Sequence, residues 1–282
     1  MLAFMDEQFP PGLYIVATPI GNLADLSPRA AATLCGAKLI LAEDKRVSAK
    51  LLKHVGATAP MWQYHDHSDE ADRDKVVARL AGEPVALVCD AGTPLISDPG
   101  YKLVRAARAA GCAVFTLPGP CAAVAALTLA GLPTDRFLFV GFLPAKAKAR
   151  SEAIAEIAGV RASLVLYESG PRLGESLAAL AAGLGEREAA VAREISKMFE
   201  ECVTGTLGEL AKRYAEAPPR GEIVIVIGPP AAPPPLDDDT LDARLAEAMV
   251  TLSPSRAAAA VAEALGLPRK RIYARALELA GD

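Results

Sequence analysis

Three turns rich in glycine and proline carry the residue types best suited to holding a small ligand. They are Thr18-Pro19-Ile20-Gly21-Asn22, Asp90 to Gly100, and Pro118-Gly119-Pro120-Cys121-Ala122-Ala123. Each turn follows an apolar run typical of a strand and leads toward a helix. Glycine and alanine let a ligand approach the backbone, and the amides at a helix start can receive oxygen or carboxylate groups. One such turn is most often structural, but three on one edge of a sheet predict a ligand site.

Familiar ligand and nucleophile motifs are missing from the chain. No Gly-x-Gly-x-x-Gly follows a strand, and neither Gly-x-x-x-x-Gly-Lys-Ser/Thr nor Gly-x-Ser-x-Gly occurs. The sequence therefore excludes an ordinary dinucleotide fingerprint, a Walker phosphate loop and a nucleophile elbow.

His65-Asp66-His67 offers ligand types that metals prefer, but it has no third or fourth ligand nearby. We therefore predict no metal site and favour a contact with RNA or substrate. Lys146, Lys148 and Arg150 could grip phosphates, although an exposed basic turn needs no function.

The first half of the chain alternates apolar runs with alanine-rich stretches at helical spacing. We expect a helix that opens at Ser27-Pro28, because serine caps helices and proline suits the first helical position. Alternation of strands and helices with short connections predicts a mostly parallel sheet covered by helices, whose ligands bind at the carboxyl ends of its strands. The expected strands are Leu13 to Ala17, Lys38 to Ala42, Val85 to Cys89 and Val114 to Leu117, and further helices lie near Ser48 to His54, Asp69 to Ala81 and Leu103 to Ala110.

The second half repeats the α/β pattern after an interruption. Gly131 to Pro144 is predicted to be the passage between domains because of its glycine and prolines. We expect strands at Ser163 to Tyr167, Ala189 to Ala192 and Glu222 to Ile227, and helices at Arg172 to Gly183 and Thr206 to Glu216. The predicted divisions are an N-terminal α/β domain over residues 12–118, a second α/β domain over 119–229, a proline-rich and acidic linker over 230–239, and a helical module over 240–282.

The helical module resembles a helix-turn-helix. Ser253-Pro254 starts a helix that runs to about Leu265, and a second helix begins at Arg269 with the basic residues Lys270 and Arg271. The alternative is an appendage for packing or dimerisation.

Composition bounds the setting. Net charge is −4, so any RNA contact must come from a local basic patch. The five cysteines are scattered without a Cys-x-x-Cys pair, which argues against disulfides and zinc. No apolar run reaches the roughly 18 residues of a membrane span, and Met1 to Phe9 does not read as a signal peptide. We therefore expect a cytoplasmic protein without a membrane segment.

Read in order, several motifs resemble one family. They are Leu13 to Leu23, Glu43-Asp44, Asp90 to Gly100, Leu117-Pro118-Gly119-Pro120, Gly131-Leu132-Pro133-Thr134-Asp135-Arg136-Phe137 and Tyr167-Glu168-Ser169. The pattern is similar to that of the ribosomal RNA small subunit methyltransferase I family, a branch of the tetrapyrrole methylase superfamily. The resemblance spans about Leu13 to Gly228, and the helical module is similar to that branch's own appendage.

The resemblance implies methyl transfer from S-adenosylmethionine to the ribose 2′-hydroxyl of a cytidine in the decoding region of 16S rRNA. It also implies a homodimer that acts on 16S rRNA or the small ribosomal subunit, with the cofactor in the cleft between two α/β domains. The residues implied to bind the cofactor are Pro19, Asp90, Ala91, Gly92, Thr93, Ile96, Ser97, Cys121, Ala122, Tyr167, Glu168 and Ile195.

A weakly acidic ribose hydroxyl benefits from a base or a field that favours the alkoxide, and our catalytic candidates are Glu43, Asp44 and Arg46. A solvated charge cluster at a strand end is the alternative. The candidate RNA contacts are Asn22, Lys45, His65, His67, Lys146, Lys148, Arg150, Arg269, Lys270 and Arg271.

The chain departs from the branch at several positions. Cys89 and Cys121 stand where serine is usual. The second-strand motif usually reads Glu-Asp-x-Arg or Glu-Asp-Thr-Arg, and here Lys45 precedes Arg46. Gly170-Pro171 replaces the usual Pro-His, which removes that histidine from the mechanism. A tetrapyrrole methylase on the same fold and a non-catalytic RNA-binding protein are the alternatives. The first usually has a glycine-rich turn after its first strand, and the second leaves three ligand-type turns unexplained.

Overall fold

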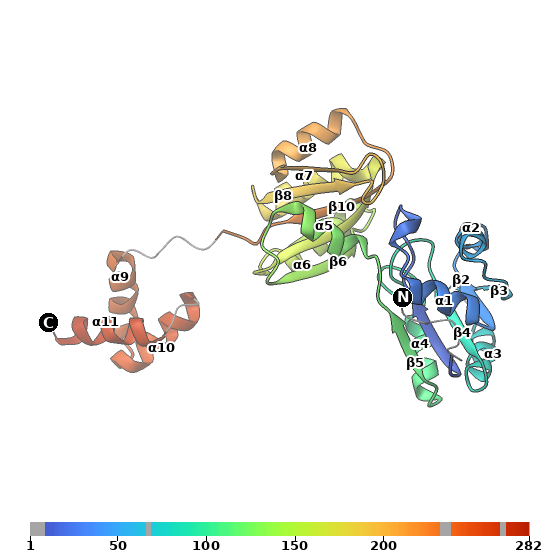
Figure 1. Cartoon of the computed structure of the whole chain (residues 1–282). Coiled ribbons are helices and arrows are strands. Elements are labelled where there is room, and N and C mark those ends of the chain that lie inside the picture. The colour runs from blue at the N-terminus through green and yellow to red at the C-terminus, as the bar shows by residue number, and fades with distance from the viewer. Residues whose placement is uncertain (1–8, 66–68, 232–237, 266–268, 282) are drawn as a thin grey trace. The chain divides into compact units, whose positions relative to one another are not determined.

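The computed structural model describes residues 9–65, 69–231, 238–265 and 269–281. The chain divides into two compact units, Met1–Pro230 and Ala231–Asp282. The first unit holds two β-sheets with their helices, and the second is helical (Figure 1). Within the described ranges, no helix combines the length and apolarity needed to cross a membrane.

The first sheet is parallel throughout. Its order is β3-β2-β4-β1-β5, formed by β1 (Gly12–Val16), β2 (Leu39–Ala42), β3 (Met61–Gln63), β4 (Pro84–Val88) and β5 (Val114–Leu117). This confirms the parallel sheet predicted for the first half of the chain. Strand β3 was not predicted, because it is a three-residue edge strand whose side chains are partly or fully exposed and show no buried alternation.

Helices cover both faces of this sheet. They are α1 (Pro28–Gly36), α2 (Lys45–Val55), α3 (Glu70–Leu80) and α4 (Tyr101–Ala109), with the short 3-10 helix η1 (Leu23–Asp25) before α1. Alternate residues of a strand point to opposite faces, so Val16 packs with Leu34 and Leu52 on one side. Ile15 packs with Leu80 and Leu103 on the other. The sheet is therefore buried on both faces.

The loops after β1 and β4 lie side by side. These strands are neighbours, yet their loops lead to α1 and α4, which pack on opposite faces of the sheet. Such a switch point is where open α/β sheets bind ligands. The two loops are joined there by backbone hydrogen bonds: Thr18 N donates to Gly92 O at 2.8 Å, and Gly92 N donates to Thr18 O at 3.1 Å.

The second sheet is mostly antiparallel. Its order is β6-β7-β10-β8-β9, formed by β6 (Phe137–Phe142), β7 (Ser163–Ser169), β8 (Glu188–Arg193), β9 (Glu201–Thr206) and β10 (Glu222–Ile227). Only β6 and β7 pair in parallel. Helix α5 (Ala122–Ala130) covers one face. Helices α6 (Ala147–Ile157), α7 (Leu173–Leu184) and α8 (Leu207–Glu216) cover the other, and the 3-10 helix η2 (Gly170–Arg172) precedes α7.

The prediction that the segment from Gly131 to Pro144 is the passage between domains was wrong. This segment contains β6, which pairs with β7 from Phe137 to Phe142. Gly141 does not mark a domain boundary. It lies where the register of β6 against β7 shifts, between Phe139 and Gly141, and its φ of 75° suits glycine. Strand β5 ends at Leu117 and α5 packs on the second sheet, so the chain changes sheets within residues 118–121.

The second unit contains α9 (Asp238–Met249), α10 (Pro254–Leu265) and α11 (Arg269–Gly281). The last two begin at the predicted residues, and the intervening turn at 266–268 lies outside the described residues. Leu245, Val261 and Ile272 contribute to a shared apolar core. Arg275 ties α11 to α9, because its guanidinium donates to Asp242 at 2.8 and 2.6 Å.

Candidate functional site

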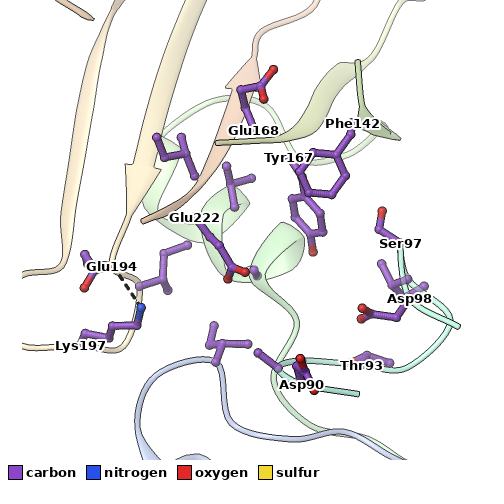
Figure 2. A pocket seen from close by; sticks show the side chains of 18 of the residues that line it. Asp90, Thr93, Ser97, Asp98, Phe142, Tyr167, Glu168, Glu194, Lys197 and Glu222 are labelled. Carbon is purple, nitrogen blue, oxygen red and sulfur yellow. Dashed lines mark hydrogen bonds and ion pairs between the residues drawn. The ribbon is translucent and has the colours of Figure 1, made fainter. Parts of the chain in front are cut away.

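A cavity of about 250 Å³ opens beside the switch point of the first sheet (Figure 2). Both sheets of the first unit contribute to its walls. The first half of the chain supplies Ile20, Glu43, Asp90, Ala91, Gly92, Thr93, Ile96, Ser97 and Asp98. The second half supplies Ala122, Phe142, Tyr167, Glu168, Glu194, Ile195, Lys197, Glu222, Ile223 and Val224.

The three predicted turns converge at this cavity. Thr18 bridges to Gly92, as described above, and the Thr93 hydroxyl donates to Pro120 O at 2.9 Å. A Cβ atom at Gly119 would lie only 2.9 Å from the Ala17 Cβ, so the third turn sits tightly on the end of β1. Small residues are therefore required where the turns meet.

The turn from Asp90 to Gly100 follows an unusual path. Leu95 and Ser97 have φ angles of 76° and 61°, in the left-handed region that side chains disfavour. Gly100 has φ 135°, and a Cβ atom there would lie 2.7 Å from Leu87 Cδ2. Each strained residue costs about 1–3 kcal/mol, so the surrounding packing must hold the turn in place.

The opposite wall is a second strained loop. Glu194 and Ser196 have φ angles of 50° and 65°. Together with Leu95 and Ser97 they are all the non-glycine residues with positive φ in the part of the chain that the structure describes. Strain of this kind concentrates at ligand sites, because there the backbone must aim side chains that regular elements cannot.

The loop that carries Glu194 and Ser196 also touches the segment that follows β1. The Ser196 hydroxyl and the Asp25 carboxylate form a hydrogen bond. A Cβ atom at Gly21 would overlap Lys197 Cγ and lie 3.0 Å from Ile195 O. Lys197 in turn pairs with Glu194 at 3.0 Å, as the dashed line in Figure 2 shows.

Carboxylates give the cavity an acidic character. Burial, together with the charges of Glu43, Asp90 and Glu222, raises the pKa of Asp98 to about 6. Burial and the neighbouring carboxylates also raise the pKa of Glu43, and His65 opposes this in part. Figure 2 shows the carboxylates of Asp98 and Glu222 pointing toward the same space. Clustered carboxylates that share one space favour a positively charged ligand.

Aromatic and aliphatic side chains form the other surfaces of the cavity. The Tyr167 ring packs edge to face against Phe139 and Phe142, with centroids 5.0 and 5.6 Å away. Its hydroxyl accepts a hydrogen bond from Ala123 N at 3.2 Å, at the start of α5. Burial raises the pKa of Tyr167, so the hydroxyl stays protonated. Such a surface suits the flat apolar face of a ligand.

Most residues predicted to bind a cofactor lie at this cavity. Ten of the twelve line it: Asp90, Ala91, Gly92, Thr93, Ile96, Ser97, Ala122, Tyr167, Glu168 and Ile195. Pro19 and Cys121 do not appear among the described lining residues, although each adjoins one, Ile20 and Ala122. The Glu168 carboxylate faces away from the cavity (Figure 2) and accepts hydrogen bonds from the Ser176 hydroxyl at 2.5 Å and Ser169 N at 2.8 Å.

Of the three predicted catalytic residues, one lies at the cavity. Glu43 lines the cavity, whereas Asp44 and Arg46 do not appear among the described lining residues. Asp44 caps α2 by accepting from Arg46 N at 2.8 Å, and it binds the Arg46 guanidinium at 2.6 Å. These hydrogen bonds hold the pKa of Asp44 at about 2.

The predicted RNA contacts are dispersed, and the prediction for Arg150 was wrong. Its side chain is buried and donates to the Glu175 carboxylate, so it cannot reach a phosphate. Asn22 is exposed and caps η1 by accepting from Ala24 N at 3.0 Å. Lys45, Lys146 and Lys148 are exposed at the starts of α2 and α6, His65 is partly buried after β3, and Arg269, Lys270 and Arg271 are exposed on α11; His67 lies outside the described residues.

Eight lining residues were not among those predicted: Ile20, Asp98, Phe142, Glu194, Lys197, Glu222, Ile223 and Val224. Ile20 and Asp98 belong to turns that the sequence already singled out. Glu222 opens a predicted strand but carries no motif of its own. Glu194 and Lys197 had no sequence signal, because only the hairpin between β8 and β9 brings them to the cavity.

Comparison with known proteins supports one family. The model of the Tetrapyrrole (Corrin/Porphyrin) Methylases matches residues 12–211, and the RsmI C-terminal HTH domain matches residues 235–280. The solved uroporphyrin-III C-methyltransferase of Thermus thermophilus, complexed with S-adenyl homocysteine, is 22% identical with a TM-score of 0.53, over 77% of this chain and 97% of that one. Diphthine synthase is 14% identical with a TM-score of 0.61, over 77% of this chain and 89% of that one.

The chain belongs to the tetrapyrrole methylase family, and the fold predicted from the sequence is confirmed. Within it, the chain belongs to the ribosomal RNA small subunit methyltransferase I group. The protein of that name from Erythrobacter litoralis is 55% identical over 97% of both chains. The one from Escherichia coli O157:H7 is 45% identical over 95% of this chain and 96% of the relative.

The raised pKa of Asp98 predicts a pH-dependent stability. Its pKa is about 6 in the folded protein and 3.8 ordinarily, so the folded state holds the proton more tightly. The stability that this proton contributes is fully present below about pH 4 and is lost as pH rises through 6. We expect the free energy of unfolding of the wild type, relative to Asp98→Asn, to fall between pH 4 and 6 and then level off in denaturant titrations.

The exposed Asp135 provides the matched control, since Asp135→Asn removes a carboxylate without touching the cavity. Parallel pH curves for the wild type and Asp98→Asn would contradict the prediction.

Proposed function

We propose that the protein methylates the ribose 2′-hydroxyl of a cytidine in the decoding region of 16S rRNA, with S-adenosylmethionine as the methyl donor. The observation that carries the proposal is the cavity at the switch point, which has carboxylates and apolar side chains in its walls. The chain also matches, over nearly their full length, relatives that are named small subunit rRNA methyltransferases. The choice of ribose and cytidine rests on the resemblance of the sequence motifs.

The residues at the cavity fit S-adenosylmethionine. The sulfonium is a cation, and Glu43, Asp98 and Glu222 bring carboxylates to the space that it would share. The adenosine needs an apolar slot with few polar anchors, which Ile223 and Val224 can provide. The S-adenyl homocysteine complex of the Thermus relative supports the same cofactor class.

The backbone at Gly92 supports close approach of the cofactor. Gly92 lines the cavity with φ 88°, and a Cβ atom there would lie 3.5 Å from Ile20 Cγ2. A larger residue would fill the cavity at the point where the first two turns meet. We assign cofactor contacts to the predicted lining residues of the Asp90 turn, to Ala122, Tyr167 and Ile195, and to the backbone near Pro19, Cys121 and Glu168.

Bound S-adenosylmethionine supplies an electrophilic methyl group on a positively charged sulfur. The protein's main task is to hold the ribose hydroxyl in line with that group, because positioning removes much of the entropic barrier. We assign acceptance of the hydroxyl proton to Glu43, since this residue lines the cavity and burial raises its pKa. Asp44 is a weak base by comparison, because its pKa is about 2.

RNA contacts are assigned to two regions. Asn22 and Lys45 are exposed beside the turn and strand end that lead to Ile20 and Glu43. Arg269, Lys270 and Arg271 begin the last helix of a domain of helix-turn-helix type. Such side chains suit phosphate contacts. A homodimer and a cytoplasmic location complete the proposal.

The reaction is tested directly with radiolabelled cofactor. We expect the purified protein to transfer the methyl label to small ribosomal subunits that lack the modification. Nuclease digestion should then release the label on the ribose of a cytidine. Label on a base, label in a porphyrin precursor, or no label on RNA would each contradict the proposed function.

The base is tested by comparing two neighbours. Glu43→Gln should lower kcat by about 10²–10⁴-fold, the usual contribution of a general base, with cofactor affinity retained. Asp44→Asn is the control, because its side chain caps α2 and is absent from the described cavity lining. Equal losses in single-turnover kinetics would show that Glu43 is not the base.

The cofactor site is tested by Gly92→Val. We expect it to abolish S-adenosylmethionine binding in calorimetry, because valine narrows the cavity and disfavours φ 88°. Gly111→Val is the matched control, since Gly111 has φ 72° and open space around it. It should show a similar backbone penalty in thermal melts but bind the cofactor normally. Unchanged affinity in Gly92→Val would place the cofactor elsewhere.

A further inference from the structure

The loop of residues 194–200 joins β8 to β9 and forms part of the cavity rim. Glu194, Ile195 and Lys197 line the cavity, and Figure 2 shows Lys197 on the side opposite Asp98. An ion pair between Arg193 Nε and Glu201 Oε2 at 2.5 Å closes the base of the loop. The loop is therefore anchored at both ends beside the cavity.

Several polar groups of this loop are paired within the protein. Lys197 N donates to Glu194 O at 2.9 Å, and Lys197 Nζ pairs with the Glu194 carboxylate at 3.0 Å. Ser196 N donates to Glu200 Oε2 at 2.7 Å, and the Ser196 hydroxyl binds Asp25 at the end of η1. These contacts hold the loop in one conformation, which lowers the entropic cost of binding a partner there.

The tip of the loop is apolar and uncovered. Met198 is 90% exposed and Phe199 is 70% exposed, directly after Lys197. An aromatic ring that a hydrogen-bonded loop leaves exposed to water is available to a binding partner.

The size of this surface favours a nucleobase over a second copy of the protein. A stable contact between protein copies buries about 800 Å² per partner, far more than two neighbouring side chains at a loop tip provide. A nucleobase needs only the face of one aromatic ring. If the reacting nucleotide occupies the cavity, the adjoining nucleotides must leave over its rim. Single-stranded RNA is commonly bound by bases stacked on aromatic side chains.

We propose that Phe199, with Met198 beside it, is a stacking platform for a base that flanks the methylated nucleotide of the RNA substrate. This inference rests on the proposed function. The carboxylates of the loop are paired, and Lys197 is bound to Glu194, so stacking rather than phosphate contact provides the interaction. Loss of the ring should then weaken RNA binding without changing its dependence on salt.

The test compares Phe199→Ala, Phe199→Trp and the control Phe137→Ala in the full-length protein. Phe137 is 49% exposed and lies at the start of β6, away from the lining residues. Loss of a base stack corresponds to roughly a tenfold rise in the KM for unmethylated small ribosomal subunits in Phe199→Ala. S-adenosylmethionine affinity, kcat and the salt dependence should stay at wild-type values, and Phe199→Trp should restore the KM.

Two outcomes would overturn the stacking role of Phe199. A KM for Phe199→Ala equal to that of Phe137→Ala would show that the ring does not contact RNA. A change in the molecular mass of the protein assembly in sedimentation, found only for Phe199→Ala, would assign the ring to a contact between two copies of the protein. Absence of methylation by the wild type would instead refute the proposed function, so the two failures are distinguishable.

Discussion

The paired backbone hydrogen bonds between Thr18 and Gly92 are the constraint on which the rest of the site depends. They join the loops after β1 and β4, which then depart toward opposite faces of the sheet. Because these two loops cannot separate, the Asp90 turn must rise beside the first turn and meet the third through Thr93 and Pro120. A parallel sheet places the ends of its strands at one edge, and this bridge turns that edge into one continuous wall.

Facing this wall is a loop that is strained in the same way. The left-handed residues Ser97 and Glu194 line the cavity from loops of the two sheets. Hydrogen bonds at Thr93 and at Ser196 restrain these loops. The sheets and helices thus form a rigid scaffold, and the irregular loops orient the side chains that line the cavity. The acidic character follows from this arrangement, because Glu43, Asp98 and Glu222 come from separate elements and share one partly buried space.

Much of the first domain could be predicted from the sequence, because strands buried on both faces leave continuous apolar runs and serine followed by proline marks the start of α1. The three turns could also be predicted, because glycine and proline directly after a strand are typical of turns. Strands β6 and β9 were missed because one carries glycine at a register shift and the other lacks a buried run. Arg150 shows the limit of reading charge alone, because only tertiary packing reveals that a basic residue faces inward.

The antiparallel pairing of β7 with β10 has a consequence for how the gene can vary in length. Tyr167 pairs with Val224, and Glu168 with Ile223, so the end of one strand and the start of the other form the cavity together. Successive residues of a strand face opposite sides, so a single codon inserted or deleted within β7 before Tyr167 would exchange its ring for the Glu168 side chain, which hydrogen-bonds to Ser176 on the other face. Natural insertions in this domain should therefore be confined to connections such as residues 158–162 between α6 and β7, where a Cβ atom at Gly159 would meet no atom within 4 Å.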